Sequence, residues 1–316
     1  MKGIFKKILR AIVYAPPVKK LVTVSKQLVL PGFDGMPVYD VADFFFTGIQ
    51  KGSIKTRATS VAFSFFLALF PAIIFLFSLI PYIPVDNFQT QLLLLIKDIL
   101  PQDAYVVARE TIEDIVRHQR GGLLSIGFVL VAFFATNGIN ALIGGFNKSY
   151  HVKETRKGLG QRLAALSITA ILSLLVVVAI LLIIYSESAL KFLVEQHIIK
   201  NKMQIVLLYA GKWLIIVALF LAAISSIYYF GPALKKRWRF ISPGSLLASM
   251  LCIVTSIGFG IFVNNFSNYN KLYGSIGTLI VIMLWIYYNS AILIIGFELN
   301  ASIDNARSSR HRSGAS

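Results

Sequence analysis

Four polar side chains interrupt long apolar segments of this chain, at positions where they could act on a solute or an ion. Asn137 and Asn140 interrupt one segment, and Asn289 and Glu298 interrupt another. A carboxylate inside a membrane can carry a proton, bind a cation or pair with a cation. These four residues form a candidate polar pathway. Helix packing through amide hydrogen bonds is the alternative interpretation of the asparagines.

Glu298 has a structural alternative of its own. It lies within one helical turn of the end of its apolar segment, where Arg57 or Arg156 could neutralise it. A buried carboxylate needs such a partner if it is to stay charged. The sequence leaves both interpretations open, a functional carboxylate or a structural ion pair.

A second group of polar residues lies in the connection from Asn264 to Tyr273, which is rich in amides and aromatic rings. Such side chains could hydrogen-bond to a lipid headgroup or a solute at the outer mouth of a pathway. The alternative is an ordinary turn, in which asparagine is favoured because it tolerates left-handed backbone. The candidate outer-mouth contacts are Asn268, Tyr269, Asn270 and Tyr273.

Residue types used in enzyme chemistry lack the necessary spacing. The sequence contains neither H-E-x-x-H nor G-x-S-x-G, and its four histidines are scattered over different segments. Cys252 is the single cysteine, so a disulfide framework and a multi-cysteine metal site are excluded. We therefore predict no catalytic residues, no metal site, no cofactor and no enzymatic activity.

The elements that carry these residues are membrane spans. Of the 316 residues, 56% are hydrophobic and 14% are charged, whereas soluble domains carry about 25% charged residues. A helix needs about 20 mostly apolar residues to cross a bilayer. Six segments qualify, at about 58–80, 123–143, 163–185, 207–230, 245–263 and 276–299. The predicted fold class is all-α, a polytopic membrane protein with six transmembrane helices and additional amphipathic helices.

We divide the chain into an amphipathic N-terminal segment (1–56), a six-span membrane domain (57–300) and a basic flexible tail (301–316). The N-terminal segment has helical amphipathic patterns from Ile4 to Val13 and again from about Asp40. Each of these helices either lies on an anionic leaflet or packs on the rest of the protein. The outer loop 81–122 is expected to form helices that cap the bundle.

Charge is distributed unequally between the two sides of this topology. Both termini and the even-numbered connections carry 22 of the 31 Lys and Arg residues, and the opposite side carries 9. Basic residues favour the cytoplasmic side of a membrane protein. We therefore expect cytoplasmic termini and an anionic inner leaflet as partner. The net charge of +17 then reflects orientation, and a nucleic-acid partner is not expected.

Several motifs resemble the YihY/BrkB family of membrane proteins. The stretch NKSYHVKETR from Asn147 is similar to the N-x-x-Y-x-V-x-E-x-R pattern of the family's connection between spans two and three. YYFGPALKKRWRFISPGSLLAS from Tyr228, FSNYNKLYGSIG from Phe266 and GFELN from Gly296 are similar to further family signatures. LPGF at Leu30 and RATSVAFSFFLALFP from Arg57 agree in pattern, although Phe63 and Phe65 replace common tyrosines. The family-motif residues of the inner loop are Asn147, Tyr150, Glu154 and Arg156.

The resemblance implies a multi-pass protein of the bacterial cytoplasmic membrane. Family members carry the labels ribonuclease BN and virulence or serum-resistance factor, so the resemblance does not define an activity. From the intramembrane polar residues we favour a protein that transports or gates a small solute, an ion or a lipid-linked substrate. The alternatives are a non-transporting envelope scaffold or resistance factor and, least favoured, a ribonuclease. A homo-oligomer is left open.

Overall fold

A computed structural model describes most of the chain. The described residues are 23–82, 90, 93, 110, 113–114, 118–149, 158–196, 202–232, 239–264 and 267–313, with the backbone alone for 184, 187–191, 193–195, 202, 205, 264, 267–276 and 311–313. Their helices are α3 (Val38–Lys51), α4 (Ile54–Leu79), the short 3₁₀ helix η1 (Ile80–Tyr82), α7 (Gly121–Asn147), α8 (Gly158–Glu195), α9 (Lys202–Phe230), α10 (Pro243–Asn264) and α11 (Ser267–Ser313). The predicted helix Ile4–Val13 and most of the outer loop 81–122 lie outside the described residues.

The predicted fold class is confirmed, because the described chain is helical and contains six helical segments long and apolar enough to cross a membrane. They are Ile54–Tyr82, Gly121–Asn147, Gly158–Ile183, Val206–Phe230, Pro243–Val263 and Gly277–Arg310. Their large apolar side chains are mostly exposed in the isolated chain. That surface suits lipid tails, which are as apolar as the side chains they would contact.

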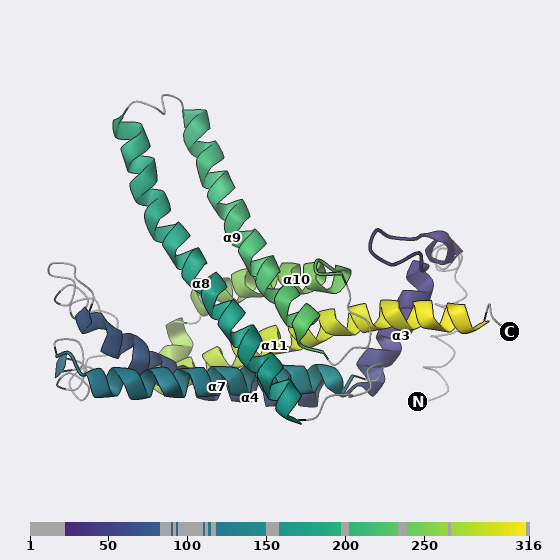
Figure 1. Ribbon diagram of the computed structural model, residues 1–316, viewed down its shortest axis with the longest axis horizontal. Helices are drawn as coiled ribbons and strands as arrows, with labels where there is room; N and C mark the ends of the chain where they lie inside the picture. The colour runs from purple at the N-terminus through teal and green to yellow at the C-terminus, as the bar shows by residue number, and fades with distance from the viewer. Residues whose placement is uncertain are drawn as a thin grey trace.

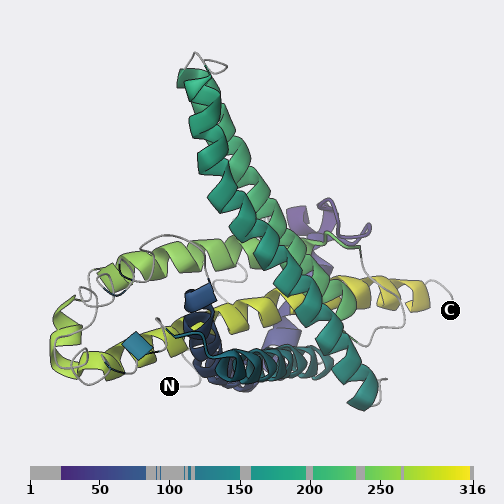
Figure 2. The ribbon, with the colours of Figure 1, turned by 60° about the vertical axis from the view of Figure 1, so that its left-hand side comes forward.

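Helices α4, α7, α10 and α11 run along a common direction, and the α8–α9 hairpin is steeply inclined to them (Figures 1 and 2). Helix α4 packs along α7, and α11 packs against α10, α4 and α3. Close approach of α10 to α11 depends on small residues. A Cβ added to Gly296 would lie 2.7 Å from the Gly244 carbonyl oxygen and 2.8 Å from the Ala248 Cβ. Small residues let membrane helices approach to this extent.

Helix α3 has the amphipathic character predicted for the segment that begins near Asp40. Its buried residues are Val41 and Gly48, and it packs against α11. Of the two alternatives for this helix, packing on the rest of the protein is therefore the one that the structure shows. Gly52, which follows α3, and Ser53, with φ of 48°, form the turn into α4.

The prediction of a flexible tail at 301–316 is wrong for most of that segment. Helix α11 continues to Ser313, and Ile303 and Ala306 are buried in a small apolar cluster with Met36 and Val41. The basic composition suggested a solvated tail. However, the apolar side chains at 303 and 306 are three positions apart, which places them on one helical face, and this face packs on α3 and the loop before it.

The connection predicted between the last two spans is also mostly helical. Helix α10 ends at Asn264 and α11 begins at Ser267, so most of the predicted connection forms the first turns of α11, and the alternative of an ordinary turn does not hold for it. Asparagine and glycine favour turns locally. Extension of an existing helix adds one backbone hydrogen bond for each residue fixed, and this outweighs a weak local preference.

Candidate functional site

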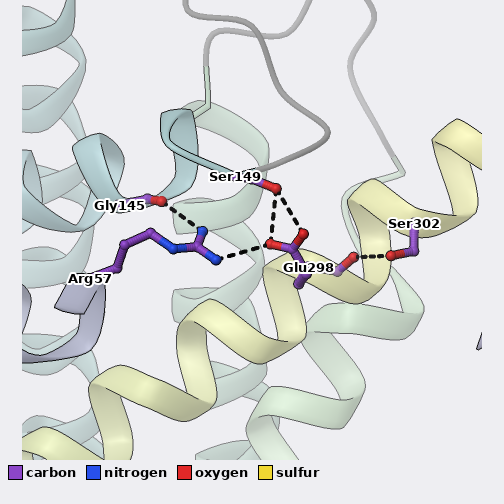
Figure 3. A network of polar contacts seen from close by, with 5 residues as sticks. All are labelled: Arg57, Gly145, Ser149, Glu298 and Ser302. Atoms are coloured by element: carbon purple, nitrogen blue, oxygen red, sulfur yellow. Dashed lines mark hydrogen bonds and ion pairs between the residues drawn. The ribbon is translucent and has the colours of Figure 1, made fainter. Parts of the chain in front are cut away.

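Glu298 of α11 is completely buried and lies where four helical elements meet. Its side chain is in contact with Arg57 in the first turn of α4 and with Ser149, two residues beyond α7 (Figure 3). Gly48 of α3 faces it from a fourth side, because a Cβ there would overlap Oε1 of Glu298. The carboxylate therefore joins α3, α4, α7 and α11. We call Arg57, Ser149 and Glu298 the carboxylate cluster.

The ion pair of the cluster is a single contact between two buried groups. Nη2 of Arg57 lies 3.3 Å from Oε2 of Glu298, and the two side chains are 4% and 0% exposed. A well-formed Arg–carboxylate pair has two parallel bonds of about 2.7–2.9 Å. Here the second amino group, Nη1, donates instead to the Gly145 carbonyl oxygen at 3.0 Å. Arg57 thus divides its donors between α7 and α11.

Ser149 supplies the second partner of the carboxylate. Its hydroxyl oxygen lies 3.0 Å from Oε1 and 2.9 Å from Oε2 of Glu298. A hydroxyl has one proton, so it donates to one oxygen at a time or is shared between both. By rotating, the Ser149 hydroxyl can also accept a hydrogen bond from a neutral carboxyl group. It can therefore form a hydrogen bond with either protonation state of Glu298.

Hydrogen bonding in the cluster is incomplete at one atom. The Nε of Arg57 is buried and has no hydrogen-bond partner among the described residues. A buried polar group without a partner costs free energy. Among the described residues, the cluster therefore contains one buried donor without a partner.

Three aromatic rings pack together next to the carboxylate cluster. The rings of Phe146 and Phe297 are stacked, with centroids 4.3 Å apart and an interplanar angle of 8°. Tyr228 packs edge-on against both rings, and its hydroxyl donates to the Leu293 carbonyl oxygen at 2.6 Å. Since Phe146 is on α7 and Phe297 adjoins Glu298, these rings fix the helices that carry the cluster.

A neighbouring polar network joins α10 to α11. The amide of Asn300 donates to the Ser242 hydroxyl at 2.8 Å, and its carbonyl oxygen accepts from the Gly244 backbone N–H at 2.8 Å. Ser242 also caps α10, because its hydroxyl accepts from the Ser245 N–H. These contacts position α11 beside the start of α10, next to the carboxylate cluster.

Comparison with known proteins decides the family. The family model described as Virulence factor BrkB matches residues 45–316, a range that contains the whole carboxylate cluster. The chain belongs to the BrkB family. This confirms the resemblance inferred from the sequence motifs.

Two relatives show how far the similarity to named proteins extends. The chain is 30% identical over 247 residues to the putative ribonuclease-like protein YfkH of Bacillus subtilis, covering 78% of this chain and 89% of that protein. It is 24% identical over 257 residues to the UPF0761 membrane protein Smlt0865 of Stenotrophomonas maltophilia, covering 78% of this chain and 56% of the relative. The chain thus spans just over half the length of the Stenotrophomonas protein. No solved structure matches the chain.

In this BrkB-family protein the four candidate pathway residues do not form one cluster. Asn140 accepts a hydrogen bond at Oδ1 from Gln161 of α8, 3.0 Å away, which joins α7 to α8. The amide of Asn289 donates to the Trp285 carbonyl oxygen of its own helix. Asn289 and Glu298 are nine residues apart on α11 and therefore point to opposite sides of it. Asn137 is partly buried on α7.

The predicted inner-loop and outer-mouth residues lie only in part within the described residues. Asn147 is buried at the end of α7. Tyr150, Glu154 and Arg156 lie outside the described residues. The backbone of 267–276 is helical, but the side chains of Asn268, Tyr269, Asn270 and Tyr273 are not described, so their role at an outer mouth stays a prediction.

The sequence offers Arg57 or Arg156 as the cation for Glu298. In the structure Arg57 forms the ion pair with Glu298. Sequence reasoning missed Ser149, Gly145 and Gly48. Ser149 lies within the family motif that begins at Asn147, but no local pattern singles out any of the three, and only helix packing brings them to the Arg57–Glu298 pair. Within the described residues, no group of three or more His, Cys, Asp or Glu side chains is close enough together to hold a metal ion.

Proposed function

We propose that this protein moves or gates a small solute, an ion or a lipid-linked substrate across the membrane, without enzymatic activity. One observation carries the proposal: a completely buried carboxylate on α11 joins α4 and the end of α7 through one ion pair and one hydroxyl, and it lies against Gly48 of α3. Ionisable groups are rare inside membrane domains and usually mark transport or proton pathways.

The carboxylate cluster has the chemistry of a latch with two states. In the charged state, Glu298 attracts Arg57 and accepts the Ser149 hydrogen bond, so α4, α7 and α11 are held together. A proton or a bound cation on Glu298 removes its negative charge, which weakens the Arg57 contact and frees that guanidinium to strengthen its contact with Gly145. A change of charge at one atom can thus shift the balance between two arrangements of the helices.

The proposal includes an orientation. The excess of basic residues on the side of the termini supports a cytoplasmic location for the end of the bundle that carries the cluster. Ser308, exposed near the end of α11, can test this location. A Ser308→Cys substitution in a Cys252→Ser background should react with a membrane-impermeant maleimide only after the cells are opened. Labelling in intact cells would contradict the orientation.

Purified protein in liposomes tests the transport proposal. Four probes cover the chemical classes: protons with an entrapped pH-sensitive dye, potassium under a concentration gradient, radiolabelled glycerol as a small solute, and a fluorescent phospholipid. Wild-type protein should move at least one probe faster than protein-free liposomes do, and Glu298→Gln should change that rate about tenfold or more. Ser167→Ala, which removes an exposed hydroxyl bonded only to its own helix, is the matched control and should leave the rate unchanged. No flux of any probe by the wild type would overturn the proposal.

A further inference from the structure

A second charged site lies at the same end of the bundle, apart from the carboxylate cluster. An open cavity of about 630 Å³ is lined by the side chains of three arginines, one aspartate and two loop residues: Arg239, Arg307, Arg310, Asp34, Gly35 and Met36. In Figures 1 and 2 the loop before α3 lies beside the C-terminal end of α11, which is the arrangement that forms this cavity. We call it the arginine cavity.

The floor of the arginine cavity is a fixed loop. Asp34 has a φ of 51°, between Gly32 and Gly35, whose φ values are 89° and 79°, so the chain turns sharply here. Backbone N–H groups of Phe33 and Met36 close this turn on Leu30 and Phe33. Met36 is buried against Ile303 of α11. These hydrogen bonds and the burial of Met36 tie the loop to α11 at the floor of the cavity.

The charges in the cavity are unbalanced. Asp34 pairs with Arg307 at 3.4 Å and with Arg239 at 3.6 Å, and Arg310 adds a third guanidinium to the same wall. Each guanidinium has five N–H donors, and the contacts of Arg239 and Arg307 to Asp34 are long. The side chains of Arg239 and Arg307 remain 73% and 41% exposed. The cavity thus offers a net charge of +2 and exposed donors arranged for an anion with several oxygens.

A smaller pocket of about 40 Å³ adjoins the arginine cavity and shares Asp34 and Arg239 with it. Asp304 and Asn300 line this pocket. The second carboxylate lowers the net charge of the combined site to +1 and leaves the anion-binding character to the larger cavity. The amide and hydroxyl groups of the small pocket suit a polar, uncharged part of a ligand.

Apolar surface flanks the arginine cavity on two sides. Leu28, Val29 and Leu30 precede its loop, and Phe240 and Ile241 follow Arg239 directly, all with 40% or more of their surface exposed. The apolar helix α10 then begins at Pro243. A charged cavity, exposed apolar side chains adjacent to it in sequence and a span that begins two residues later are the features expected of a site at the depth of lipid headgroups.

We propose that the arginine cavity binds the phosphate-bearing headgroup of an anionic membrane lipid. Arginine forks bind phosphate oxygens in pairs. The cavity is also within the range of about 300–1,000 Å³ that holds an organic ligand, far more than one phosphate ion fills. Asp34 pairs with both Arg239 and Arg307 at the edge of the cavity. The acyl chains would then lie on the exposed side chains beside it.

Native mass spectrometry of the full chain in neutral detergent tests this site. The protein is mixed with equal amounts of phosphatidylglycerol and phosphatidylcholine, and the ratio of retained lipids is measured. Wild type should retain phosphatidylglycerol preferentially, and each of Arg307→Gln and Arg310→Gln should lower that preference about five-fold. Lys55→Gln removes an exposed cation at the start of α4 and should change the preference less than two-fold.

Three outcomes would overturn the lipid site. An equal loss in Lys55→Gln and in the arginine variants would mean a general effect of charge. Competition by millimolar inorganic phosphate would mean a site for a free anion, and competition by an acidic phosphopeptide would mean a protein partner. Arg310 is exposed on the surface of α11, so its variant keeps the test valid if Arg307→Gln does not fold. Failure here leaves the flux assay of Glu298→Gln unaffected, since the two sites share no residue.

Discussion

Removal of Arg57 should destabilise the protein more than any loss of a surface ion pair, because it leaves Glu298 charged and buried with only the Ser149 hydroxyl. Breaking a buried pair in this way costs about 3–5 kcal/mol, which we expect for Arg57→Met. In Glu298→Gln the amide oxygen still accepts from Arg57, and Arg57 keeps its bond to Gly145 at 3.0 Å. This variant should therefore lose only about 1–3 kcal/mol.

The double variant Arg57→Met/Glu298→Gln measures the interaction energy between Arg57 and Glu298 separately from the loss of each side chain. It contains no buried charge at this site, so it should be less destabilised than the sum of the two single variants by about 2 kcal/mol or more. The measurement is unfolding in mixed micelles, followed by the fluorescence of the three tryptophans. Simple addition of the single losses would refute the reasoning.

An exposed pair provides the control for this experiment. Arg120 and Asp114 are 2.6 Å apart, closer than Arg57 and Glu298, but their side chains are 55% and 40% exposed. Surface pairs contribute about 0–1 kcal/mol, so Arg120→Met should have little effect. If Arg120→Met and Arg57→Met lost equal stability, burial would not be the cause we assign.

Three further predictions use the same bundle. Gly48→Ala should cost about 1–3 kcal/mol in the micelle assay, since its Cβ would overlap Oε1 of Glu298; Gly258→Ala, with open space around it, is the control, and equal stability of the two would contradict the close approach of α3. Tyr228→Phe should cost about 1 kcal/mol through loss of the bond to Leu293, and Tyr288→Phe, at an exposed position, should cost less; the reverse order would be contradictory. Ile303→Asp should expose the end of α11 to limited proteolysis, whereas exposed Ser308→Asp should not; the wild-type cleavage pattern in Ile303→Asp would contradict the packing of this end on α3.

The spans could be predicted from the sequence because membrane insertion depends on local composition. Twenty apolar residues identify a span whatever its neighbours are. The ion pair was partly predictable for a similar reason. Arg57 lies at the start of one span and Glu298 near the end of another, on the same side of the predicted topology. Their opposite charges and similar depth in the membrane therefore made Arg57 a candidate partner of Glu298.

The rest of the site depends on contacts that no local pattern encodes. Ser149 and Gly48 matter because α7 and α3 bring them to the Glu298 carboxylate. Similarly, Asn289 is polar and lies in the same span as Glu298, yet nine residues of helix turn it to the opposite face. The end of α11 was misjudged because its charges were given more weight than Ile303 and Ala306, which pack on α3 and its loop.

The rate of probe flux through liposomes that contain equal amounts of wild-type protein and Glu298→Gln tests the central claim most directly. If the carboxylate cluster controls a pathway, the wild type moves protons, potassium, glycerol or phospholipid, and the variant changes that rate about tenfold or more while Ser167→Ala does not. Wild type and Glu298→Gln with the same rate would contradict the claim, and would leave Glu298 and Arg57 as an ion pair that only holds the helices together.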